Sequence, residues 1–146
     1  GSDRWTAAGK EIQRQIDLHP NAADIHTTGI VNFGPELFEL YRQHDICVLP
    51  SLSEGTPRTL VEARAFGCPV VASRVGGIPT SIQDGEDGLL VPPGDAPALA
   101  SAISRLLDDE VLRHKLIRVG CERFGHHTVD EFATQIVAEL KTVAAI

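Results

Sequence analysis

The 146-residue sequence has no long apolar run, few cysteines and comparatively little positive charge. Its apolar runs are only a few residues long, far short of the roughly 20 that a membrane-spanning helix needs. No basic segment followed by an apolar one opens the sequence, so it predicts no secretion signal. The 13 Lys and Arg residues are outnumbered by 20 Asp and Glu residues, which gives a net charge of −7. This balance argues against nucleic-acid binding, which needs a basic surface, but not against binding of a small phosphorylated ligand.

The three cysteines, Cys47, Cys68 and Cys121, are odd in number and form no C-x-x-C pair. We therefore expect reduced, mostly buried thiols in a cytoplasmic protein. The six histidines include no H-x-x-x-H pair and no Cys/His cluster. The sequence accordingly predicts no metal site.

Short apolar segments alternate with segments of helical spacing, which predicts an α/β fold with a parallel sheet. Continuous apolar runs are typical of parallel strands that are covered on both faces. Such runs occupy residues 46–49, 70–72 and 89–91, with 24–28 as a weaker fourth candidate. Helical spacing occupies residues 5–16, 35–43, 57–66, 96–107, 112–119 and a last segment from Thr128. Proline at a first helical position and Asp95 as an N-cap support three of these helix starts.

The order of the elements is unusual, because a helix comes first and only three or four strands follow. A doubly wound sheet places its first strand at the centre. We therefore expect residues 1–146 to form a single, N-terminally truncated domain that lacks its first strands. Unpaired strand edges and apolar helix faces would then make the chain form homodimers, exchange elements or be unstable alone.

Two loops that pair glycine with proline follow the first two predicted strands, S-L-S-E-G-T-P at 51–57 and S-R-V-G-G-I-P at 73–79. Ligands bind beyond the carboxyl ends of strands in open parallel sheets, and a helix start beside a glycine favours phosphate. Together the loops offer a place for a diphosphate. Turn formation alone also explains such loops. Glu54 is equally explained as a complement to a helix N-terminus, and Glu62 as one exposed helical carboxylate among many.

Residues 49–95 carry a series of motifs in a fixed order: Glu-Gly-x-Pro, Glu-Ala, Gly-x-Pro-Val-Val-Ala-Ser, Val-Gly-Gly-Ile-Pro, Asp-Gly-x-x-Gly-Leu-Leu-Val and Pro-Pro-Gly-Asp. This series closely resembles the C-terminal, nucleotide-sugar-binding domain of the glycosyltransferase group 1 family, the retaining family-4 enzymes with the GT-B fold. The resemblance is good over residues 24–120 and looser on both sides. It implies an α/β, Rossmann-like, doubly wound parallel sheet that forms the C-terminal half of a GT-B fold.

The resemblance also implies a role for each matching residue. Glu54 is expected to lie against the donor sugar near the reacting centre, as the catalytic residue. Glu62 is expected to hold the ribose hydroxyls of the nucleotide, and Ile30 lies in the region that approaches the base. The loop residues expected to contact the sugar hydroxyls and the diphosphate are Gly55, Thr56, Pro57, Arg58 and Thr59.

Some positions are expected to be structural or depart from the family pattern. Gly76 and Gly77 are expected to shape the floor of the donor site more than to touch the ligand. Arg58 stands where an apolar residue is expected, and it either reaches a phosphate or is a surface change. Arg64 and Phe66 replace small or sulfur-containing residues of the pattern. The family's basic segment that neutralises the diphosphate has no match in this sequence.

The resemblance implies a glycosyltransferase that binds a nucleoside diphosphate sugar for retaining transfer to an acceptor sugar, lipid or small molecule. A missing N-terminal domain would hold the acceptor, no cofactor or metal would be required, and the chain alone is expected to be inactive. The full-length enzyme is expected to be cytoplasmic or peripheral to a membrane. Two other interpretations remain open: a non-catalytic nucleotide-sugar-binding subunit of a split glycosyltransferase, and an epimerase of similar fold. The sequence identifies neither the sugar and base of the donor nor the acceptor.

Overall fold

The structure is a computed structural model that describes residues 7–124. The chain divides into two compact units, with the boundary between Asn32 and Phe33. In the first unit, α1 (Ala7–Asp17) is followed by the short 3-10 helix η1 (Ala22–Asp24) and by residues without regular secondary structure. The helix predicted at 5–16 is confirmed by α1 over the described residues, whereas the helix predicted from Thr128 lies outside them.

The strand predicted at residues 24–28 is wrong. Asp24 ends η1, and residues 25–28 form no strand and are exposed. The segment D-I-H-T-T contains a single apolar side chain, Ile25, so it has little apolar surface to gain by covering a sheet. A short polar run of this kind does not supply the burial that stabilises an inner strand.

The second unit is built on a small parallel sheet in the order β1-β2-β3. The strands are β1 (Cys47–Leu49), β2 (Val70–Ser73) and β3 (Leu89–Val91), with Val48 opposite Val71 and Ala72 opposite Leu90. All residues of β2 and β3 are buried, as their continuous apolar sequences predict. β1 lies at one edge, and its Val48 is 36% exposed. The self-association predicted from open edges stays a prediction.

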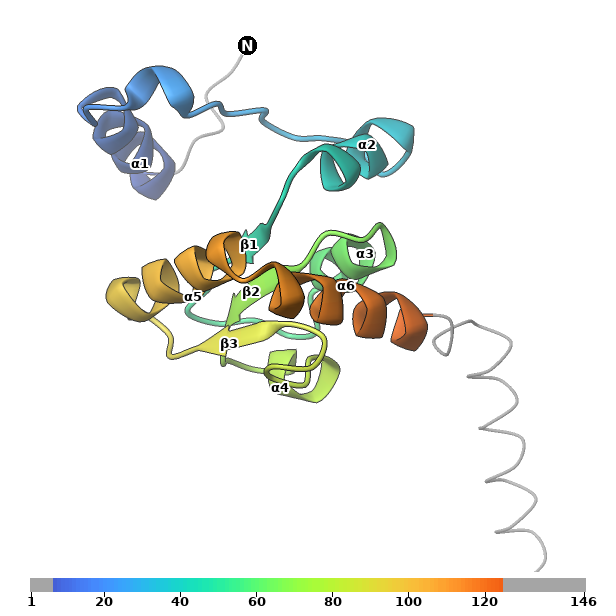
Figure 1. The fold of residues 1–146 in the computed structure, drawn as a ribbon. Coiled ribbons are helices and arrows are strands. Elements are labelled where there is room, and N and C mark those ends of the chain that lie inside the picture. The colour runs from blue at the N-terminus through green and yellow to red at the C-terminus, as the bar shows by residue number, and fades with distance from the viewer. Residues whose placement is uncertain (1–6, 125–146) are drawn as a thin grey trace, which may run out of the picture. The chain divides into compact units, whose positions relative to one another are not determined.

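Helices cover both faces of the sheet, so the predicted doubly wound α/β arrangement is confirmed (Figure 1). One face packs against α2 (Pro35–Gln43), α3 (Arg58–Ala65) and the short α4 (Ile78–Ser81). The other packs against α5 (Ala96–Asp108) and α6 (Glu110–Phe124). Neighbouring residues of β2 face opposite sides, with Val70 and Ala72 in the first core and Val71 in the second. This alternation follows from the two-residue period of a strand.

The helix boundaries follow the predicted start signals. Pro35 opens α2, Pro57 precedes the first residue of α3, and the Asp95 carboxylate accepts a hydrogen bond from the Ala98 N–H at 2.9 Å as the N-cap of α5. α3 ends before Gly67, whose φ of +78° is in the left-handed region that ends many helices. α4 is too short for its periodicity to be read from sequence.

Arg64, a departure from the family pattern, has a structural role. Its guanidinium is buried and pairs with the fully buried Asp87 carboxylate at 2.5 Å, and its Nε donates to the Leu60 carbonyl at 3.1 Å. Arg123 of α6 also contacts the Asp87 carboxylate, at 3.1 Å. Gly120 of α6 leaves the space that the Arg64 stem occupies, because a Cβ there would lie 3.3 Å from the Arg64 Cβ. These three side chains therefore join α3, α6 and the loop before β3.

Candidate functional site

The loops that follow β1 and β2 lie against each other at the carboxyl edge of the sheet. The Gly77 N–H donates a hydrogen bond to the Gly55 carbonyl at 2.9 Å. A Cβ on Gly76 would lie 1.8 Å from the backbone oxygen of Glu54, and one on Gly77 would lie 2.7 Å from that of Gly55. Only glycine permits this approach without moving a backbone. The structure therefore gives Gly76 and Gly77 a packing role between the two loops, and their expected place at the floor of the donor site stays a prediction.

Glu54 lies in the loop after β1 and is half-buried. The Ser51 hydroxyl donates a hydrogen bond of 2.7 Å to its Oε1 atom. This bond occupies one acceptor position on one carboxylate oxygen and leaves Oε2 available to another donor. Glu54 is thus held by a residue only three positions earlier and by the contact of its own backbone with Gly76. Its predicted role at the donor sugar stays a prediction.

The remaining loop residues lead directly into α3. Gly55, Thr56, Arg58 and Thr59 are exposed, and Pro57, half-buried, is the N-cap residue. No side chain of the described residues caps this helix start. The first N–H groups of a helix have no partner inside the helix and carry partial positive charge. The start of α3 can therefore accept an anion beside Glu54.

Glu62 lies one helical turn after Arg58 on α3, and its side chain is 19% exposed. The Tyr41 hydroxyl of α2 donates to Glu62 Oε2 at 3.1 Å, and an Arg58 guanidinium nitrogen lies 3.5 Å from Oε1. Burial, together with this hydrogen bond, raises the pKa of Tyr41 to about 12. Tyr41 therefore remains a hydroxyl donor at neutral pH and fixes the Glu62 carboxylate from one side.

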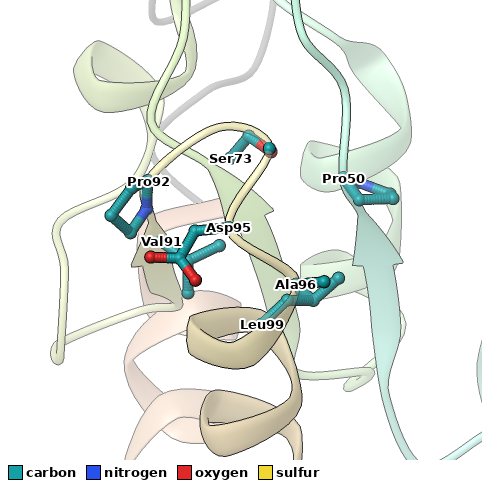
Figure 2. A pocket seen from close by; sticks show the side chains of 8 residues that line it. Pro50, Ser73, Val91, Pro92, Asp95, Ala96 and Leu99 are labelled. Carbon is teal, nitrogen blue, oxygen red and sulfur yellow. The ribbon is translucent and has the colours of Figure 1, made fainter.

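A small hollow of about 140 Å³ opens at the carboxyl ends of all three strands (Figure 2). It is lined by Pro50 after β1, Ser73 of β2, Val91 and Pro92 at the end of β3, and by Gly94, Asp95, Ala96 and Leu99 around the start of α5. Sequence reasoning used the Pro-Pro-Gly-Asp segment as a family motif and its Asp95 as an N-cap, but predicted no hollow there. The hollow is smaller than the roughly 300–1,000 Å³ of typical ligand pockets. Neither glutamate lines it, so the edge formed by the loops is the better candidate for a nucleotide.

The second unit therefore brings together most of the predicted site residues: Glu54, Gly55, Thr56, Pro57, Arg58, Thr59, Glu62, Gly76 and Gly77. Ile30 belongs to the first unit, where it is exposed, and its role stays a prediction. Sequence reasoning missed Ser51 and Tyr41 as partners of the two glutamates. Ser51 stands only three positions before Glu54 in the same loop, which is a local signal for that pair, whereas no local signal links Tyr41 to Glu62, 21 positions away.

The family model described as Glycosyl transferases group 1 matches residues 2–109. The chain belongs to the glycosyl transferase group 1 family. It is 44% identical over 106 residues to a D-inositol 3-phosphate glycosyltransferase from Acidothermus cellulolyticus, a match that covers 69% of this chain and 23% of that protein. The chain thus spans about a quarter of the length of this relative.

Solved structures agree with the family assignment. Sucrose-phosphate synthase from Thermosynechococcus elongatus superposes with a TM-score of 0.83 at 30% identity, covering 99% of this chain and 37% of that chain. The C-terminal domain of a glycosyl transferase group 1 family protein from Francisella tularensis gives 0.72 at 30% identity, covering 83% and 62%. The Anabaena protein HepE in complex with UDP, at 24% identity and a TM-score of 0.79, covers 94% and 36% and shares the fold.

Among residues 7–124, no group of three or more His, Cys, Asp or Glu side chains is placed to hold a metal ion. Within the same residues, none of the helices combines the length and the apolarity that crossing a membrane requires.

Proposed function

We propose that this chain binds the nucleoside diphosphate sugar donor of a retaining glycosyltransferase. The observation that carries the proposal is the uncapped start of α3, framed by Glu54 in the preceding loop and by Glu62 one turn into the helix. In this arrangement the helix-start amides hold the diphosphate, Glu54 accepts hydrogen bonds from the sugar, and Glu62 accepts them from the ribose. The family membership and the shared fold of HepE, which has been solved with UDP and with UDP-glucose, support this donor class.

The proposed reaction transfers the sugar to an acceptor that residues outside this chain bind. The chain's contribution is to orient the donor and to stabilise the departing diphosphate with the partial positive charge at the start of α3. We propose that binding needs no metal ion, so EDTA leaves the donor affinity unchanged. We further propose a cytoplasmic location. In its support, all three thiols are free and burial raises the pKa of both Cys47 and Cys68, as expected of thiols that stay reduced.

Isothermal titration calorimetry of the 146-residue chain with UDP and with UDP-glucose measures the two affinities and tests the proposal. Glu62→Gln is expected to weaken both ligands about tenfold or more, because a hydrogen bond to a charged group contributes about 1.5–3 kcal/mol. Glu54→Gln is expected to weaken UDP-glucose and to leave UDP unchanged, because only the sugar reaches Glu54. Glu122→Gln, which alters an exposed carboxylate on α6, is the matched control.

The two glutamate variants separate the parts of the proposal. Equal loss of UDP and UDP-glucose affinity in Glu54→Gln would show that Glu54 does not face the sugar. Absence of binding of any nucleoside diphosphate or its sugar by the unmodified chain up to millimolar concentration would refute donor binding by this chain.

A further inference from the structure

An aromatic cluster lies beside Glu62, and one of its rings faces solvent. The Phe38 and Phe66 rings stack with centroids 4.6 Å apart, and Tyr41 stacks on Phe66 at 6.1 Å. Phe33, just before α2, meets Phe38 edge-on, with centroids 5.1 Å apart and an interplanar angle of 86°. Phe33 is 66% exposed, whereas Tyr41 is buried. The cluster thus fixes the Phe33 ring from one edge and leaves most of its surface accessible.

Arg58 connects this exposed ring to Glu62. Its guanidinium carbon lies 5.5 Å from the centroid of the Phe33 ring, within the range of a cation–π contact. A nitrogen of the same guanidinium lies 3.5 Å from Glu62 Oε1, and the Arg58 side chain is 80% exposed. One guanidinium group therefore spans the gap between the ring and the carboxylate.

The Glu62 carboxylate keeps acceptor capacity for a ligand. An ionised carboxylate offers about four acceptor positions on its two oxygens. Tyr41 takes one on Oε2 and Arg58 approaches Oε1, which leaves enough positions for two hydroxyl groups. Vicinal ribose hydroxyls present two donors at the spacing of one carboxylate.

We propose that the base of the bound nucleoside diphosphate stacks on the platform formed by Phe33 and Arg58, while its ribose hydroxyls bind Glu62. This inference rests on the proposed function and adds a binding surface for the base. The flat ring and the flat guanidinium both suit a planar π system, and stacking of this kind tolerates different bases. The departure at Arg58 then has a function, because an apolar residue at this position would neither pair with Glu62 nor present a planar cation.

Phe33→Leu is the deciding variant, because it keeps an apolar side chain and removes the aromatic face. Loss of base stacking is expected to weaken UDP at least about fivefold. The affinity for inorganic diphosphate, which lacks a base, is expected to stay within about twofold. Val111→Ala, which truncates an 82% exposed apolar residue on α6, is the control and should leave UDP binding unchanged. Far-UV circular dichroism of each variant confirms that it is folded.

Proton shifts of the nucleotide provide a second readout. Stacking on Phe33 is expected to move the uracil H5 and H6 resonances of bound UDP upfield by ring current, and Phe33→Leu should abolish this shift. These shifts decide the case in which diphosphate binds too weakly for comparison.

The outcomes separate this inference from the proposed function. UDP affinity in Phe33→Leu within about twofold of the unmodified chain, or an unchanged uracil shift, overturns the stacking platform and leaves donor binding intact. Equal weakening of UDP and diphosphate also overturns it, since the variant would then have disturbed the phosphate loop. Failure of the unmodified chain to bind UDP overturns both.

Discussion

Replacing Gly76 by alanine tests whether the contact between the two loops positions Glu54. The new Cβ would lie 1.8 Å from the Glu54 backbone oxygen and 2.8 Å from its carbonyl carbon, far inside van der Waals contact. One of the two backbones must therefore move by more than an ångström. Because the Glu54 side chain is attached to the displaced segment, the carboxylate moves with it.

The expected cost has two parts. Gly76 has a φ of +51°, and an L-residue in this left-handed region costs about 1–2 kcal/mol. Separation of the loops also breaks the hydrogen bond from Gly77 N–H to the Gly55 carbonyl, which is worth about 1 kcal/mol and more if a partner stays buried. We expect Gly76→Ala to lower the free energy of unfolding by about 2–4 kcal/mol, a large share of the 5–15 kcal/mol typical of a domain.

Gly85 offers a matched control in the same unit. Its φ is +76°, but a Cβ there would meet nothing within 4 Å. Gly85→Ala therefore carries the backbone cost without the clash. Urea unfolding of both variants, followed by far-UV circular dichroism, gives the difference directly. We expect Gly76→Ala to be less stable than Gly85→Ala by about 1–2 kcal/mol and to be the only one of the two that weakens UDP-glucose binding. Equal stability and equal affinity of the two variants would refute the coupling between the loops.

Three further predictions concern other parts of the second unit. Asp87→Asn is expected to lower the free energy of unfolding by about 3–5 kcal/mol, because it leaves the Arg64 charge buried without its partner. Glu122→Gln, in the exposed pair with Arg118, should lower it by less than about 1 kcal/mol. Similar losses for the two variants in urea unfolding would contradict this. Because the pKa of Tyr41 is raised from about 10 to about 12, stability from this group is complete below pH 10 and is lost as the pH rises through 12. Tyr41→Phe should therefore flatten the fall in unfolding free energy over that interval, and an unchanged slope would refute the shift. Cys121 is exposed, whereas burial raises the pKa of Cys47 and Cys68. A thiol reagent at pH 8 should therefore react quickly with one thiol per chain, that of Cys121. A fast phase of the reaction that survives in Cys121→Ser would contradict this assignment.

Features that depend on local sequence were predictable. The strands at 46–49, 70–72 and 89–91 follow from continuous apolar runs, and the structure differs from them by at most one residue at an end. The helix starts at Pro35 and after Pro57 follow from the fixed φ of proline. The strand predicted at 24–28 was wrong because this mostly polar segment has little apolar surface to bury against a sheet, and residues 25–28 are exposed.

Features that depend on contacts between distant residues were not predictable. Arg64 was identified only as a departure from the family pattern, and its partner Asp87 stands 23 positions later in the loop before β3. Tyr41 has the apolar spacing of α2, and only the packing of α2 on α3 places its hydroxyl beside Glu62, 21 positions away. The sequence motifs identified the loop residues, but the contacts that hold these residues in place could be seen only in the folded structure.

The two glutamates depend on different parts of the molecule. Glu54 is positioned by Ser51 in its own loop and by the close approach of the loop after β2. Glu62 is positioned by Tyr41 of α2 and by Arg58, which also contacts Phe33. Changes in the glycine pair should therefore act on the sugar end of the proposed donor site, and changes in α2 or Phe33 on its nucleoside end. These two sets of contacts share no residue. The residues at the nucleoside end can therefore change, as Arg58 does relative to the family pattern, while the loop that carries Glu54 keeps its packing.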